Sequence, residues 1–259
     1  MKFSIITPSL NQGRFIRDCI ESVRAQGGVD WEHIVIDAGS TDETISVLKE
    51  YPHLKWISEP DQGMSDGINK GFLKAEGDWV MWLNGDDYLL PDTLAKVAAF
   101  TAKNVQADII YGECIFVDES KKILRHRWEH EFDFSILLFY GCYIPSTSTF
   151  IRRNVIAAGE LLQTDYRVCM DFEYYVRLSE RGFRFKFLPA PLACFRWHPT
   201  NTSMVHATRR SQERIRVQQE YLLRQGRKRL ASEKILSVLW RLFAIKRLVL
   251  RFVSRYFQR

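Results

Sequence analysis

Two adjacent carboxylates, Asp86 and Asp87, follow directly after a short apolar segment, Trp79–Leu83. An apolar segment of this length predicts a buried strand, whereas neighbouring Asp side chains repel each other and are costly to bury. In open α/β sheets, ligands bind at the carboxyl ends of the strands. A hard divalent cation held by carboxylates and substrate phosphates fits this chemistry, and a solvated Asn-Gly-Asp-Asp turn is the alternative.

Asp37 also follows a predicted strand, residues 33–36, and begins a polar loop that runs to Asp42. We therefore expect Asp37 at the same sheet edge as Asp86, where a carboxylate can accept a hydrogen bond from a base N–H or a ribose hydroxyl. A helix-capping loop is the alternative. Ser40 and Glu43 already form a capping box, however, which leaves Asp37 for ligand binding.

Asp171 and Glu173 lie at the start of a predicted helix. Acidic residues in a first helical turn interact favourably with the helix dipole, and from spacing alone this structural interpretation is favoured. The functional alternative is a general base that removes a proton from an acceptor hydroxyl.

A polar loop after a later predicted strand contains Arg196, His198 and Ser203. Together these side chains could bind phosphate oxygens or a metal ion. A structural or solvated histidine is the alternative.

Predicted strands and helices alternate along the chain. The strands are at 4–6, 33–36, 54–57, 79–83, 108–111 and 185–188, and the helices are at 11–23, 40–48, 63–75, 91–100 and 171–181. This alternation predicts an α/β fold with a doubly wound, mostly parallel sheet flanked by helices. Residues 112–150 are irregular, with mixed strand signals. The sequence contains no P-loop, dinucleotide-binding fingerprint or nucleophile elbow.

The composition is that of an ordinary globular protein, with 259 residues, 46% hydrophobic and 26% charged. This length accommodates one α/β domain and an appendage. The five cysteines are widely spaced without a Cys-x-x-Cys motif, which argues against a disulfide framework or a zinc cluster. A reducing compartment and cytoplasmic folding are expected, because the first residues predict a strand rather than a signal peptide.

The net charge of +6 is unevenly distributed. Residues 205–259 contain fifteen Lys and Arg against three Asp and Glu, which leaves 22 basic and 28 acidic residues in 1–204. We therefore expect a mildly acidic main domain, 1–204, and a basic helical tail, 205–259.

The last part of the tail, 233–257, predicts an amphipathic helix with basic residues on one side and a broad apolar remainder. It has no uncharged run of the ~18–20 residues needed to span a bilayer. A basic amphipathic helix with aromatic residues suggests peripheral contact with an anionic membrane surface, on the inner face. Docking on the chain's own domain or on a homodimer partner is the alternative. Nucleic-acid binding is disfavoured by the acidic main domain.

Six segments, taken in order, resemble the motifs of family 2 glycosyltransferases of the GT-A fold. The resemblance covers roughly residues 2–204, and the segments are Ser4–Asn11, Val35–Asp42, Asp61–Gly63 with Asn69–Gly71, Leu83–Asp87, Met170–Glu173 and Arg196–His198. It implies an inverting, metal-dependent transfer of a hexosyl-type sugar from a nucleotide sugar, a UDP-sugar above all, to an acceptor hydroxyl. The expected acceptor is a saccharide or lipid-linked saccharide in surface polysaccharide biosynthesis.

The resemblance also implies roles for individual residues. Asp37 would bind the nucleoside base, with Thr7, Pro8 and Ser9 in the same pocket. Asp86 would lie near the ribose, and Arg196 would also contact the donor. Asp87 and His198 would hold Mg²⁺ or Mn²⁺, which neutralises charge on the leaving diphosphate. Asp171 would be the catalytic base.

The sequence departs from the family pattern at two places. Met170 stands where Glu is common, and Gly67-Ile68-Asn69 stands where Ala-Arg-Asn is common, so Asp66 would make a different donor contact. Two other functions stay open at this point: a nucleotidyltransferase that makes a nucleotide sugar, and a non-catalytic nucleotide-sugar-binding protein.

Overall fold

The structure is a computed structural model that describes residues 1–201 and 205–257. Within these residues, nine strands form one sheet in the order β3-β2-β1-β4-β8-β6-β9-β5, and β7 pairs with β6. The strands are β1 (Lys2–Ser9), β2 (Asp30–Asp37), β3 (Lys55–Ser58), β4 (Trp79–Trp82), β5 (Tyr88–Leu89), β6 (Ile109–Val117), β7 (Ile123–Arg127), β8 (Thr149–Arg152) and β9 (Phe185–Arg196).

The sheet is mostly parallel, as predicted. β1 pairs in parallel with β2 and with β4, β2 with β3, and β6 with β9. The exceptions are β8, which is antiparallel to both β4 and β6, and the short β5 and β7. All four residues of β4 are buried, which is typical of a parallel strand covered on both faces.

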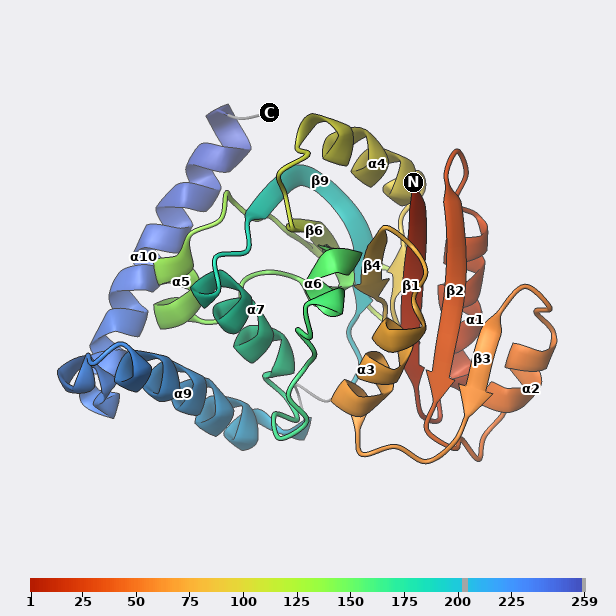
Figure 1. Cartoon of the computed structure of the whole chain (residues 1–259), viewed down its shortest axis with the longest axis horizontal. Helices are drawn as coiled ribbons and strands as arrows, with labels where there is room; N and C mark the ends of the chain where they lie inside the picture. The colour runs from red at the N-terminus through yellow and green to blue at the C-terminus, as the bar shows by residue number, and fades with distance from the viewer. Residues whose placement is uncertain (202–204, 258–259) are drawn as a thin grey trace.

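Helices cover both faces of the sheet (Figure 1). They are α1 (Gly13–Arg24), α2 (Thr44–Lys49), α3 (Met64–Lys74), α4 (Thr93–Lys103), α5 (Phe134–Tyr140), α6 (Arg153–Ala157), α7 (Met170–Glu180), α9 (Ala207–Arg224) and α10 (Glu233–Phe257), with short 3₁₀ turns at Ser146–Ser148 and Lys228–Ala231.

Successive strand residues point to opposite faces, and the core divides accordingly. Ile6 of β1 packs in a cluster with residues of α3, α5 and α7, whereas the adjacent Ile5 packs with residues of α1 and α4. A Cβ at Gly71 of α3 would stand 2.1 Å from Cγ2 of Ile6, so the glycine permits the close packing of α3 on β1.

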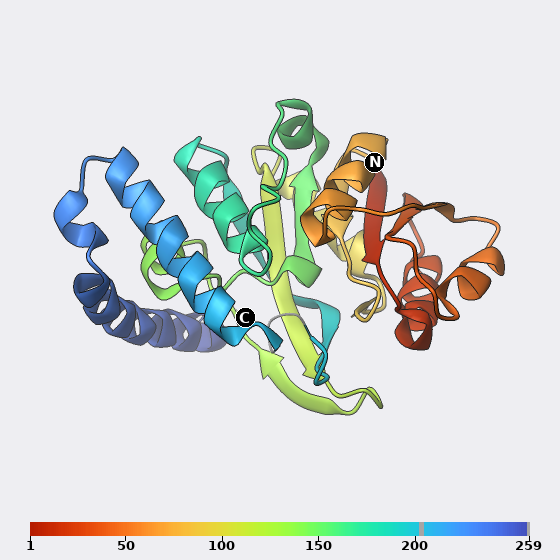
Figure 2. The same ribbon diagram turned by 90° about the horizontal axis from the view of Figure 1, so that it is seen from below.

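The C-terminal helices pack against the rest of the chain (Figure 2). α9 joins α7 through an ion pair of Arg224 with Glu180 at 2.8 Å. α10 lies on α5, where the rings of Phe243 and Phe139 are 5.0 Å apart. Arg247 also pairs with the buried Glu129 at 2.7 Å. One face of the predicted amphipathic helix therefore docks on its own domain.

Two local predictions were wrong. Ser40 does not cap α2; its hydroxyl donates to Asp37 instead. The N-cap position of α2 is Glu43, which forms no side-chain cap bond, and the preceding Asp42 binds the helix start instead. Its Oδ1 accepts from Thr44 N at 2.9 Å while Oδ2 accepts from Gly13 N at 3.0 Å, so one carboxylate anchors the starts of α2 and α1. Residues 112–150 are more regular than expected, because they complete β6 and contain β7, α5 and the start of β8.

Candidate active site between two cavities

A cavity of about 670 Å³ opens at the carboxyl ends of β1, β2 and β4, and we name it the first cavity. It is lined by residues at and after the ends of these strands and by residues of other strands, helices and loops: Pro8–Gln12, Ala38, Asp61, Gly63, Met64, Trp82, Asn84–Asp86, Ser146, Arg167, Val168, Met170, Asp171, Phe195, His198, Thr200 and Asn201. A cavity therefore lies at the carboxyl ends of the strands, where the sequence predicted the site.

Asp86 and His198 form a pair on the wall of the first cavity. Asp86 Oδ2 lies 2.9 Å from His198 Nε2 and 3.4 Å from Asn201 Nδ2. The other ring nitrogen of His198 lies 2.8 Å from Thr200 Oγ1, and its ring packs on Phe15 with centroids 5.1 Å apart. The imidazole is therefore oriented from both of its nitrogens.

Asp87 lies next to Asp86 in the chain but turns away from the first cavity. Its side chain is fully buried, and Oδ1 accepts the backbone N–H of Arg196 at 2.9 Å. Burial, with a further contribution from the Asp86 charge, raises the pKa of the Asp87 carboxyl well above its usual range. The structure thus brings Asp86 rather than Asp87 together with His198.

Arg196 is also buried and faces neither cavity. Its Nε donates to the carbonyl oxygen of Asp86 at 2.8 Å, and Nη2 pairs with Asp18 at 2.7 Å. Its Nη1 donates to the carbonyl oxygen of Glu119 at 2.9 Å. All three guanidinium nitrogens are engaged, so Arg196 fixes the loop that carries Asp86.

Asp37 is fully buried and holds its own loop together. Its oxygens accept from the backbone N–H groups of Gly39 and Ser40 and from the hydroxyls of Ser40 and Ser58. It does not line the first cavity, whereas the adjacent Ala38 does.

The other predicted donor residues divide between cavity and core. Pro8 and Ser9 line the first cavity. Thr7 is buried and lies 2.8 Å from His33 Nε2. Asp66 accepts from Gln62 N and pairs with Lys70 at 3.6 Å, outside the lining. Ser203 lies outside the described residues.

Two charged residues that line the first cavity, Asp61 and Arg167, were not predicted to have a role. Asp61 comes shortly after β3, which ends at Ser58 beside Asp37, the last residue of β2, so its position in the sequence was a usable signal. A Cβ at Gly67 would stand 3.0 Å from Asp61 Oδ2, so this departure from the family pattern leaves room for the Asp61 carboxylate. Arg167 lies in the irregular segment before α7, where no sequence pattern pointed to a role.

A second cavity of about 610 Å³ adjoins the first and shares four lining residues with it, Ser146, Val168, Asp171 and Phe195. Half of its other described lining is aromatic or basic, and it includes residues of α9 and α10: Phe116, Arg125, Arg127, Tyr140, Phe172, Trp197, Arg210, Arg214 and Trp240, with Cys114, Gly141, Cys142, Ile144, Pro145, Thr147, Cys169, Ala207 and Ser211.

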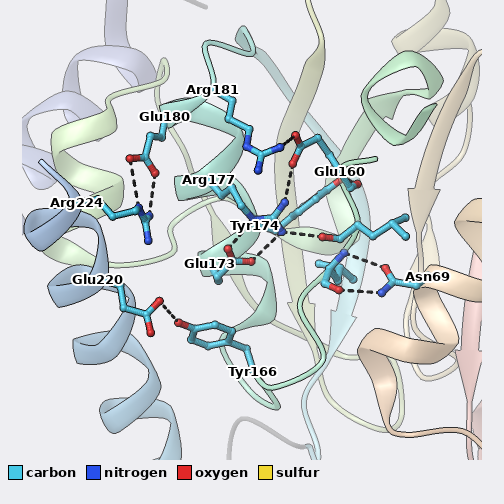
Figure 3. Close-up of polar contacts among 12 residues, drawn as sticks. Asn69, Glu160, Tyr166, Glu173, Tyr174, Arg177, Glu180, Arg181, Glu220 and Arg224 are labelled. Carbon is cyan, nitrogen blue, oxygen red and sulfur yellow. Dashed lines mark hydrogen bonds and ion pairs between the residues drawn. The ribbon is translucent and has the colours of Figure 1, made fainter. Parts of the chain in front are cut away.

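Asp171, in the first turn of α7, lies where the two cavities meet. Burial raises the pKa of its carboxyl, which the backbone N–H of Phe172 and the positive charge of Arg127 partly offset. The Phe172 N–H donates to Oδ1 at 2.7 Å. Glu173 points elsewhere and pairs with Arg177 at 2.7 Å, as Figure 3 shows. Of the two acids, Asp171 alone lines both cavities.

The residues present also bear on a divalent cation. Within 1–201 and 205–257, no three His, Cys, Asp or Glu side chains are grouped so as to hold a metal ion. Mg²⁺ is commonly held by only one or two carboxylates, with substrate phosphates and water completing its shell. The Asp86–His198 pair on the cavity wall fits such a substrate-completed site.

Fold and site together define a class, a GT-A-type α/β enzyme with its ligand site at the ends of the parallel strands. The family model described as "Glycosyl transferase family 2" matches residues 4–173, and the chain belongs to this family. It is a glycosyltransferase that acts on nucleotide sugars.

Relatives support this assignment. A "PGL/p-HBAD biosynthesis glycosyltransferase" of Mycobacterium tuberculosis is 35% identical over 181 residues, which cover 68% of each chain. An uncharacterized glycosyltransferase of Nostoc is 28% identical over 84% of this chain and 71% of its own length.

Two solved structures share the fold. TarS residues 1–349 of S. aureus, in complex with UDP-GlcNAc, gives a TM-score of 0.71 at 18% identity, over 91% of this chain and 72% of TarS 1–349. The mannosyltransferase PcManGT of Pyrobaculum calidifontis, in complex with GDP-Man and Mn²⁺, gives 0.64 at 18% identity, over 92% and 68%.

Proposed function

We propose that this protein is an inverting glycosyltransferase that transfers a sugar from a UDP-sugar to an acceptor hydroxyl. The donor binds in the first cavity, the acceptor binds in the second, and Asp171 is the catalytic base. The observation that carries this proposal is the position of Asp171, whose carboxylate lines both cavities.

Transfer to an acceptor hydroxyl requires a base where the two cavities meet. The acceptor oxygen attacks the anomeric carbon on the face opposite the leaving nucleoside diphosphate, and the base accepts the hydroxyl proton. A base is most effective when its pKa approaches the working pH. The raised pKa of Asp171 moves the carboxylate in that direction.

The donor site uses Asp86 and His198 at the diphosphate and Ser9, Ala38 and Asp61 at the nucleoside. A bound Mg²⁺ or Mn²⁺ would be held by Asp86 and His198 and would neutralise charge on the leaving diphosphate. Asp87 is reassigned from metal ligand to positioning residue, because its carboxylate is bound to the Arg196 N–H. Asp37 and Arg196 likewise position loops of the site.

A membrane-bound acceptor is supported by the outer face of α10. Seven of the ten exposed large apolar residues described in this helix recur every three or four positions: Ile235, Val238, Leu242, Ile245, Val249, Phe252 and Tyr256. Glu233 is the only acidic residue of the helix. Lys234, Arg241 and Arg255 of α10 are exposed and form no ion pair among the described residues, and anionic lipids would complement them. We therefore propose that α10 lies on an anionic bilayer at the inner membrane face, where the enzyme extends a lipid-linked saccharide of a surface polysaccharide. No helix among the described residues is apolar over enough length to cross a bilayer.

A donor panel tests the proposal. Nucleotide sugars are added with and without Mn²⁺, and thermal stabilisation, released nucleotide and the anomer of the released sugar are measured. We expect stabilisation by a UDP-sugar, release of UDP, and a sugar of inverted configuration when water replaces the acceptor. Release of pyrophosphate would indicate a nucleotidyltransferase instead, and binding without turnover under any condition would indicate a non-catalytic binding protein.

A further inference from the structure

Two arginines of α9, Arg210 and Arg214, line the second cavity one helical turn apart. Within 1–201 and 205–257, neither guanidinium forms an ion pair or a hydrogen bond. The other arginines of this helix are neutralised, since Arg209 pairs with Glu213 and Arg216 pairs with Glu220, each at 2.7 Å. Arg224 pairs with Glu180 (Figure 3). The unpaired positive charge of α9 is thus confined to the cavity.

This arrangement is unfavourable without an anion. Arg214 is half-buried, and burial together with the charge of Arg210 lowers its pKa. Like charges four residues apart destabilise a helix, and a partly desolvated guanidinium without a counter-ion adds to that cost. An anion bound between the two side chains would remove both penalties and gain charge-assisted hydrogen bonds.

The rest of the lining adds positive charge and aromatic surface. The guanidinium carbon of Arg125 lies 4.3 Å from the centroid of the Phe116 ring. Arg125 has no carboxylate partner among the described residues. Arg127, in contrast, pairs with Glu129 at 2.8 Å. Among the residues that the structure describes, Asp171 is the only acidic one that lines the cavity, so positive charge dominates.

Three rings stand beside these charges. The centroid of the Phe116 ring is 5.0 Å from that of Phe195 and 6.0 Å from that of Trp197. Phe116 is buried and supports the other two rings, whereas Phe195 is partly exposed and Trp197 is exposed. These two rings offer flat apolar surface to a sugar face or a hydrocarbon segment, while the arginines would hold a charged group.

We propose that the second cavity binds an acceptor that carries a phosphate or diphosphate group, with Arg210 and Arg214 as its ligands and the Phe116–Phe195–Trp197 cluster as its platform. The identification of the occupant as the acceptor rests on the proposed function, whereas the anion site itself does not.

Phenyl phosphate serves as the probe, because it combines one phosphate ester with one ring. Its affinity for the full-length protein is measured by calorimetry beside that of phenyl β-D-glucoside, which has the ring without the charge. The variants are Arg214→Gln, Arg210→Gln and Arg214→Lys. Arg216→Gln is the matched control, since it removes the same charge from the same helix outside the cavity.

We expect phenyl phosphate to bind wild type and Arg216→Gln equally, and at least about tenfold more weakly to Arg210→Gln and Arg214→Gln, in line with the loss of a charged hydrogen bond. Arg214→Lys should be intermediate, because it keeps the charge and loses the bidentate fork. Equal affinities in Arg214→Gln and Arg216→Gln, or equal binding of the neutral glucoside, would overturn the proposal.

UDP affinity is measured in the same variants to separate this proposal from the proposed function. UDP should bind all of them as it binds wild type. If no nucleotide binds while phenyl phosphate binding still depends on Arg214, the anion site stands and the glycosyltransferase assignment of the cavities fails. If UDP binds normally and the affinity for phenyl phosphate is unchanged in Arg214→Gln, the anion site fails while the proposed donor cavity stands.

Discussion

The two cavities share four lining residues and differ in charge. The first is lined by the carboxylates of Asp61 and Asp86, with a histidine and Arg167. The second is lined by arginines and aromatic rings, and Asp171 is the only acidic residue in its described lining. Carboxylates suit a divalent cation that accompanies a diphosphate, whereas unpaired guanidinium groups suit an anion directly. The difference indicates that the cavities take different substrates and meet at one carboxylate.

The largest effect is expected at that carboxylate. Asp171→Asn should lower kcat about 10²–10⁴-fold, the usual contribution of general-base catalysis, while UDP affinity stays at the wild-type value. Glu173→Gln is the control, since Glu173 lies in the same turn and pairs with Arg177. A comparable loss of kcat in both variants would show that the substitutions act by disturbing the first turn of α7 and not by removing a catalytic base.

The adjacent aspartates should separate into a binding and a structural role. Asp86→Asn should weaken Mn²⁺-dependent UDP binding with little change in unfolding free energy. Asp87→Ala should instead lower the unfolding free energy by about 1–3 kcal/mol, because it leaves the buried Arg196 N–H without its acceptor. Urea unfolding and UDP calorimetry on both variants measure the two effects. If Asp87→Ala weakened Mn²⁺-dependent UDP binding and Asp86→Asn only lowered the unfolding free energy, Asp87 would be the metal ligand instead.

The pKa of Asp171 couples activity and stability to pH. The raised value means that kcat/KM should fall as pH drops through a midpoint above the ordinary carboxyl value of about 4. The folded state holds this proton more tightly than the unfolded state, so stability should decline as pH rises through the same window. Asp171→Asn should therefore have a higher Tm than wild type at neutral pH and not below pH 4. If the difference in Tm between Asp171→Asn and wild type did not change with pH, the pKa of Asp171 would not be raised in the folded protein.

The smallest effect is expected on the outer face of α10. Ile245→Ser with Phe252→Ser should reduce sedimentation with phosphatidylglycerol vesicles without changing UDP affinity, because both side chains are exposed. Neutral phosphatidylcholine vesicles are the control. Equal partitioning of wild type and variant would leave α10 without a membrane role.

The sheet and the strand-end site were predictable because they depend on local pattern. The apolar run of β4 and the polar residues after it are read directly from neighbouring positions. The opposite orientation of Asp86 and Asp87 was not predictable from local pattern, because it depends on the backbone N–H of Arg196, which is 109 residues away from Asp87 in the sequence. The second cavity depends on α9 packing near β6 and α7, and helical periodicity does not specify which elements a helix will meet.

The central claim is that two substrates bind in separate cavities on either side of Asp171. The most direct measurement is the titration of phenyl phosphate into the full-length protein, first alone and then saturated with UDP and Mn²⁺. We expect phenyl phosphate to bind with the same affinity in both titrations, and Arg214→Gln to weaken it in both. Mutual exclusion of UDP and phenyl phosphate would show that they compete for one cavity and would contradict the claim.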